Sequence, residues 1–155
     1  MREHNLSLPH IVELQSVQLY GATVDVRLEI SADGSLTIII SAKDPNAAEI
    51  KLVSSKMWLG LTAGRYLSVD LEELEEHGAN RFAMAATYTQ GIIKHGLRET
   101  VLLVNEKVIS SKCVIPVPGK PIEICREIAV LEKIVSAAGR IGANRQEKQY
   151  VYPPY

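Results

Sequence analysis

The sequence predicts an α+β fold, with a mainly antiparallel sheet of about five to seven strands, an inserted helical pair and a C-terminal zipper-like helix. Segments of alternating apolar and polar residues indicate half-buried strands, and tight-turn dipeptides join them. Helical periodicity appears after capping residues and after a proline-rich break. With 155 residues, 46% of them hydrophobic, the chain has the size and apolar content of one globular domain.

The strands of the first half follow from alternation and turn residues. Residues 23–30 place an apolar side chain at every second position, which is typical of a half-buried antiparallel strand. The dipeptide Asp33-Gly34 suits the positive φ angles of a tight hairpin, so residues 36–40 return as a central strand. With a bulged first strand expected at 11–19, the fourth strand is expected at 48–53, after the turn at Pro45.

The helical pair is predicted in the middle of the chain, after a glycine-containing loop that leads to a short strand at 66–69. Asp70 is an N-cap residue for a first helix, which Gly78 ends. A second helix is expected over 81–95, capped by Asn80 and ended by Gly96, with an apolar stripe and a basic last turn that suits the helix dipole. A hairpin of two further strands then closes the sheet over 100–115.

The C-terminal helix is predicted from Ile122 to about Ala138 by an apolar stripe with spacings of 4, 3, 4 and 3 residues, which is a heptad pattern. The stripe, and thus the expected oligomerisation surface, consists of Ile124, Ile128, Leu131, Val135 and Ala138. One interpretation places this helix across its own sheet. The favoured one pairs it with a second copy of the chain. The expected organisation is therefore a sheet domain (1–120), an oligomerisation helix packed on it (121–145) and a flexible tail (146–155).

Charge and composition limit the classes of function. Seventeen basic and eighteen acidic side chains give a net charge of −1, so nucleic-acid binding would need a local basic patch. Apolar runs are too short to cross a membrane, and the two cysteines, Cys113 and Cys125, lack a CxxC spacing. We therefore expect a cytoplasmic protein, with no membrane partner and both thiols in the core.

Signatures of catalysis, of metal binding and of cofactor binding are missing from the sequence. The four histidines form no HxxxH pair, and no serine occupies a GxSxG turn. Glycine patterns for phosphate loops or dinucleotide binding do not follow any predicted strand. We therefore expect no metal and no cofactor, and a binding protein rather than an enzyme.

The best candidate site is an aromatic and basic loop. Single-stranded nucleic acid is held by flat rings that stack on bases, beside cations that neutralise phosphates. Both kinds of side chain gather near Gly60 and Gly64, and the candidate residues are Lys51, Lys56, Trp58, Arg65 and Tyr66. The other interpretation of Trp58 is a core anchor.

Two other functions stay open. A scaffold subunit without its own ligand would recruit a protein partner through the oligomerisation helix and the Tyr/Pro-rich tail. A small-ligand protein or an enzyme would form its site between subunits, and a deep apolar pocket with Tyr88, Lys94 or His95 at its base would indicate it.

Overall fold

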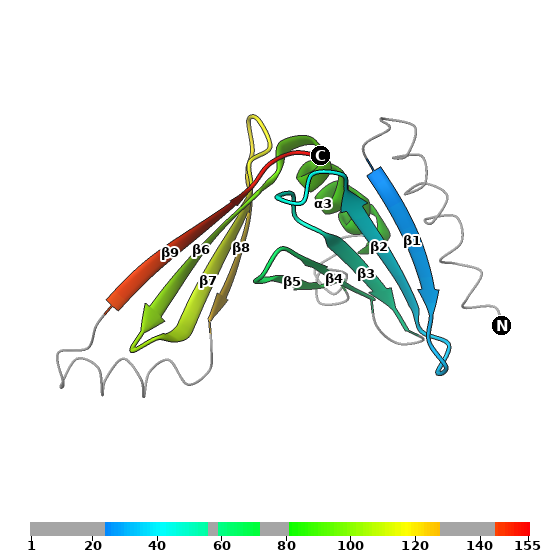
Figure 1. Ribbon diagram of the computed structural model, residues 1–155, viewed down its shortest axis with the longest axis horizontal. Coiled ribbons are helices and arrows are strands. Elements are labelled where there is room, and N and C mark those ends of the chain that lie inside the picture. The colour runs from blue at the N-terminus through cyan, green and yellow to red at the C-terminus, as the bar shows by residue number, and fades with distance from the viewer. Residues whose placement is uncertain (1–23, 56–58, 72–80, 128–144) are drawn as a thin grey trace.

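The computed structural model describes residues 24–55, 59–71, 81–127 and 145–155. In these ranges the chain forms two antiparallel sheets joined by one helix (Figure 1). The first sheet has the order β1-β2-β3-β4-β5 and the second the order β8-β7-β6-β9. The elements are β1 (Val24–Ile30), β2 (Leu36–Ala42), β3 (Ile50–Ser54), β4 (Leu59–Ala63), β5 (Leu67–Asp70), α3 (Arg81–His95), β6 (Leu97–Val104), β7 (Lys107–Ile115), β8 (Ile122–Glu127) and β9 (Arg145–Tyr152).

The first sheet is a meander in which each strand pairs with the next along the chain. The β1–β2 hairpin forms where it was predicted, but its connection spans residues 31–35 and only Gly34 has a positive φ, of 83°. The Asp33 carboxylate accepts a hydrogen bond from the Ser35 amide at 2.9 Å. Side chains at alternate positions of β2, β3 and β4 are almost fully buried and form the inner face: Ile38, Ile40, Ile50, Leu52 and Leu61.

Helix α3 lies where the two sheets approach each other, and the sheets diverge from there (Figure 1). Its apolar side packs into the same buried cluster as the inner face of the first sheet, through Ala85, Tyr88, Ile92 and Ile93. Residues from β6 and β7 join this cluster, so one core connects the sheets. The helix ends as predicted, at a glycine with a φ of 79°, whose amide donates to the Ile92 carbonyl oxygen at 2.8 Å.

The second sheet is built on the predicted β6–β7 hairpin. Asn105 and Glu106 connect the strands with φ angles of 49° and 66°, as a two-residue turn matched to the strand twist requires. Strand β9 pairs with β6 along its whole length. Residues 146–155, which we expected to form a flexible tail, therefore supply most of an edge strand.

The predicted fold class is wrong in its helices and in its number of sheets. Nine strands in two sheets replace the single sheet of five to seven, and α3 is the only helix in the described ranges, which include neither a helical pair nor a C-terminal helix. The first helix of the expected pair falls mainly on 72–80, outside those ranges. Strand β4 lies in the stretch that we had interpreted as a loop.

The predicted C-terminal helix begins at Ile122, but residues Ile122–Glu127 form strand β8. Ile122 and Ile124 lie opposite Ile115 and Cys113 of β7, on the core-facing side. Two apolar residues in alternation fit a strand as well as a helix, so pairing with β7 decides the outcome. No helix in the described parts of the chain combines the length and the apolar character needed to cross a bilayer.

Candidate functional site

The β4–β5 loop of the first sheet meets strand β9 of the second, and this contact brings an arginine and two tyrosines together. The guanidinium carbon of Arg65 lies 4.7 Å from the centre of the Tyr150 ring, within the range of a cation–π interaction. The rings of Tyr66 and Tyr150 are 5.9 Å apart and tilted by 41°. We call Arg65, Tyr66 and Tyr150 the aromatic platform.

A buried carboxylate holds the loop in this position. Glu99 of β6 is fully buried, and its Oε1 accepts hydrogen bonds from the amides of Tyr66 at 2.8 Å and Leu67 at 3.0 Å. Its Oε2 accepts from the amide of Arg65 at 3.1 Å. Three consecutive amides pointing at one carboxylate form an anion-binding turn, so Glu99 fixes the backbone from which the platform side chains project.

Three further residues surround this carboxylate, among them Cys113, whose thiol donates to Glu99 Oε1 at 3.9 Å. The hydroxyl of Tyr152 donates to Glu99 Oε2 at 3.0 Å. Burial, followed by this hydrogen bond, raises the pKa of Tyr152 to about 12, so the hydroxyl stays a donor at neutral pH. Gly64 has a φ of 60°, and a Cβ atom there would lie 2.8 Å from Glu99 Oε1. The close approach of the loop to β6 therefore depends on a glycine.

The platform is accessible to a ligand. Arg65 is exposed, whereas Tyr66 and Tyr150 are half-buried. Lys148 is exposed and lies two residues before Tyr150, so both side chains project from the same face of β9, roughly 7 Å apart along the strand. Burial, then the neighbouring Tyr150, raises the pKa of Tyr66, which stays uncharged at neutral pH. The surface thus combines two neutral rings with two cations.

The structure assembles only part of the predicted candidate site. It brings Arg65 and Tyr66 together, but Lys51 faces away from the core on β3, two strands from β5, and pairs with Glu49 at 3.6 Å. Lys56 and Trp58 lie outside the described residues. The prediction for these two, including the interpretation of Trp58 as a core anchor, stays a prediction.

Sequence reasoning missed Tyr150, Lys148 and Glu99. The aromatic and β-branched residues Tyr150, Val151 and Tyr152 favour strands, and this propensity could have indicated one. Glu99 stands between the polar residues Arg98 and Thr100 and gives no comparable signal, because its burial is set by the β4–β5 loop, more than thirty residues earlier in the chain.

The predicted oligomerisation surface is described at one position only. Ile124 lies on β8 and packs against the core of its own chain. Ile128, Leu131, Val135 and Ala138 lie outside the described residues, so self-association stays a prediction. Recruitment of a protein by the C-terminal segment also stays a prediction, although Tyr155 docks inside this domain, with its amide donating to the Ile93 carbonyl oxygen at 2.9 Å.

Within the described ranges, no cluster of three or more histidine, cysteine, aspartate or glutamate side chains could hold a metal ion. Comparisons with protein-family models, with curated proteins and with solved structures found no match.

Proposed function

We propose that this protein binds single-stranded nucleic acid on the aromatic platform, without catalysing a reaction. The observation that carries the proposal is the packing of the exposed Arg65 guanidinium on Tyr150, beside Tyr66. Flat rings and guanidinium planes are the groups on which unpaired bases stack, and stacking of this kind does not depend on base identity.

The arrangement of the three side chains suits stacking because it is formed before a ligand arrives. The exposed Arg65 guanidinium already lies over the Tyr150 ring, 4.7 Å from its centre, so these two groups are arranged before a base stacks on them. The Glu99 carboxylate fixes the Arg65 and Tyr66 backbone, so little conformational entropy is lost when a strand binds.

The charges near the platform are those that a phosphate backbone requires. Arg65 and Lys148 supply two cations beside the rings, although the whole chain carries a net charge of −1. Each phosphate neutralised on a single strand contributes about −0.7 to the slope of log affinity against log salt. Two contacts therefore predict a slope of about −1.4, a weak and local electrostatic contribution.

Fluorescence anisotropy of a labelled 20-residue oligothymidylate at 50 mM salt would test the proposal. We expect binding at micromolar protein, and a loss of roughly 5-fold to 100-fold for Tyr150→Ala, because one stacked ring contributes about 1–3 kcal/mol. Tyr150→Phe keeps the ring and should bind within about 2-fold of the wild type. Arg65→Ala should weaken binding and also reduce the salt slope by about 0.7.

Arg27→Ala is the matched control, because Arg27 is an exposed arginine on β1, at the opposite edge of the first sheet from the platform. It should leave the affinity unchanged. The absence of any anisotropy change at 50 µM wild-type protein would refute the proposal. Equal losses for Arg27→Ala and Arg65→Ala would also refute it, because binding would then follow total charge rather than the platform.

A further inference from the structure

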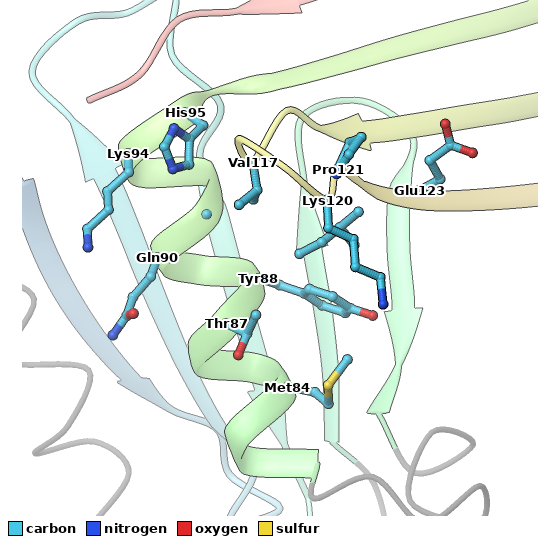
Figure 2. A pocket seen from close by; sticks show the side chains of 12 residues that line it. Met84, Thr87, Tyr88, Gln90, Lys94, His95, Val117, Lys120, Pro121 and Glu123 are labelled. Carbon is cyan, nitrogen blue, oxygen red and sulfur yellow. The ribbon is translucent and has the colours of Figure 1, made fainter.

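A groove of about 620 Å³ lies between α3 and the segment that connects β7 to β8 (Figure 2). This volume is within the range of small-molecule sites in proteins, roughly 300–1,000 Å³. Its apolar lining comes from half-buried side chains on both sides of the groove, including Met84 from the helix and Val117 and Ile122 from the connection and the start of β8. A second cavity, of about 530 Å³, shares Tyr88 and Glu123 with it.

Two polar groups in this groove lack a partner in the described part of the chain. Tyr88 is only 5% exposed, yet its hydroxyl makes no hydrogen bond to a described residue. Lys120 forms no ion pair there. Figure 2 shows the Lys120 side chain extending down the groove on the side where the Tyr88 hydroxyl points. An ammonium and a phenol hydroxyl therefore present donors to the same space.

Glu123 and Lys94, two other charged side chains of the lining, point away from the part of the groove that holds Lys120 and the Tyr88 hydroxyl, so no carboxylate there repels an anion. Glu123 forms an ion pair with Lys112 at 3.1 Å, and its carboxylate points away from Tyr88 in Figure 2. Lys94 extends from the opposite side of α3, together with Gln90. Burial raises the pKa of Tyr88, so its hydroxyl remains a proton donor at neutral pH.

We propose that this groove binds a small carboxylate with an apolar body. The ammonium of Lys120 and the hydroxyl of Tyr88 receive the carboxylate, and Met84, Val117 and Ile122 contact the apolar part. A compact apolar lining with a few convergent donors is the usual composition of such sites, and the donors select for the charge of the ligand. This site is separate from the aromatic platform, with which it shares no residue.

The test uses 4-phenylbutyrate as the probe and the uncharged 4-phenylbutyramide as its matched analogue, with amide chemical shifts of the full chain as the readout. We expect the acid to shift amides in 84–95 and 117–123 with a dissociation constant in the millimolar range, and the amide to bind at least 10-fold more weakly. Lys120→Met, which keeps a long apolar side chain, should abolish the preference for the acid. Tyr88→Phe should reduce it.

Lys107→Met, at the start of β7, is the control and should bind the acid as the wild type does. Tyr150→Ala should also leave probe binding unchanged, which separates this proposal from the nucleic-acid proposal. The proposal is overturned if 10 mM acid shifts none of these amides, or if acid and amide bind equally well. It is also overturned if Lys120→Met retains the wild-type preference in a protein with a native spectrum.

Discussion

Glu99 joins the two sheets through hydrogen bonds, so its replacement should lower both the free energy of unfolding and the order of the platform. In Glu99→Gln one oxygen remains to accept from the Tyr66 and Leu67 amides, but an NH₂ group replaces the acceptor of the Arg65 amide and the Tyr152 hydroxyl. Hydrogen bonds to charged groups contribute about 1.5–3 kcal/mol each.

The hydrogen bonds from the Arg65 amide and from the Tyr152 hydroxyl are both partly buried, so water can replace part of what the substitution removes. We therefore expect Glu99→Gln to lower the free energy of unfolding by about 2–4 kcal/mol, and Glu99→Ala to lower it further, because Ala leaves the buried Leu67 amide without an acceptor as well. Urea denaturation followed by far-UV circular dichroism measures the difference.

Glu147→Gln is the matched control, since Glu147 is an exposed glutamate on β9 of the same sheet. It should change the free energy of unfolding by less than about 0.5 kcal/mol. If Glu99→Gln costs no more than this control, the loop is not held by the carboxylate and the reasoning is refuted. Combining Glu99→Gln with Tyr152→Phe should give a loss smaller than the sum of the single losses, because the two substitutions remove one shared hydrogen bond.

Three other predictions follow from the same region. Gly64→Ala should lower the free energy of unfolding by more than about 1 kcal/mol, because the φ of 60° disfavours a side chain and the Cβ atom would meet Glu99. A urea midpoint unchanged from the wild type would contradict this. The expectation that both thiols lie in the core is wrong for Cys125, which is exposed. Thiol titration at pH 8 should therefore label Cys125 alone, because Cys113 is buried and burial, then Glu99, raises its pKa to about 12; two reactive thiols in folded protein would contradict this. The free energy of unfolding should fall as the pH rises from about 10 to 12. Unfolded tyrosine ionises near pH 10 while the pKa of Tyr152 in the folded state is about 12, so the folded state binds more protons in this range. Tyr152→Phe should show a smaller fall, and an equal fall would contradict the assignment.

The hairpins were predictable because their signals are local. Alternation and turn residues lie next to each other in β1–β2 and in β6–β7, and the structure confirms both hairpins. Helix α3 was predicted at its observed bounds from a cap, a stripe and a terminal glycine. Strand β4 was missed because Gly60 interrupts its short alternation, although Leu59 and Leu61 are buried.

The errors at the C-terminal end have a different origin. The start of the expected helix became edge strand β8 because it pairs with β7, the preceding strand along the chain. The expected tail became edge strand β9 because it pairs with β6, which is distant in sequence. Strand β9 is mainly charged and polar, so it has no apolar pattern of its own, and its pairs with β6 run from Val104 with Arg145 to Leu97 with Tyr152. Only part of the candidate site was predictable, for the same reason. The composition of the β4–β5 region indicated Arg65 and Tyr66, whereas Tyr150 reaches them only because β9 pairs with β6.

The central claim is that Arg65, Tyr66 and Tyr150 form one surface that contacts unpaired bases. Amide chemical-shift mapping of the full chain with an unlabelled 20-residue oligothymidylate tests it most directly. In a titration from sub-stoichiometric to saturating oligonucleotide, we expect the largest amide shifts in residues 64–67 and 146–152. Shifts concentrated elsewhere, for example at the Ser31–Ser35 turn of β1–β2, or no shifts at all, would contradict it.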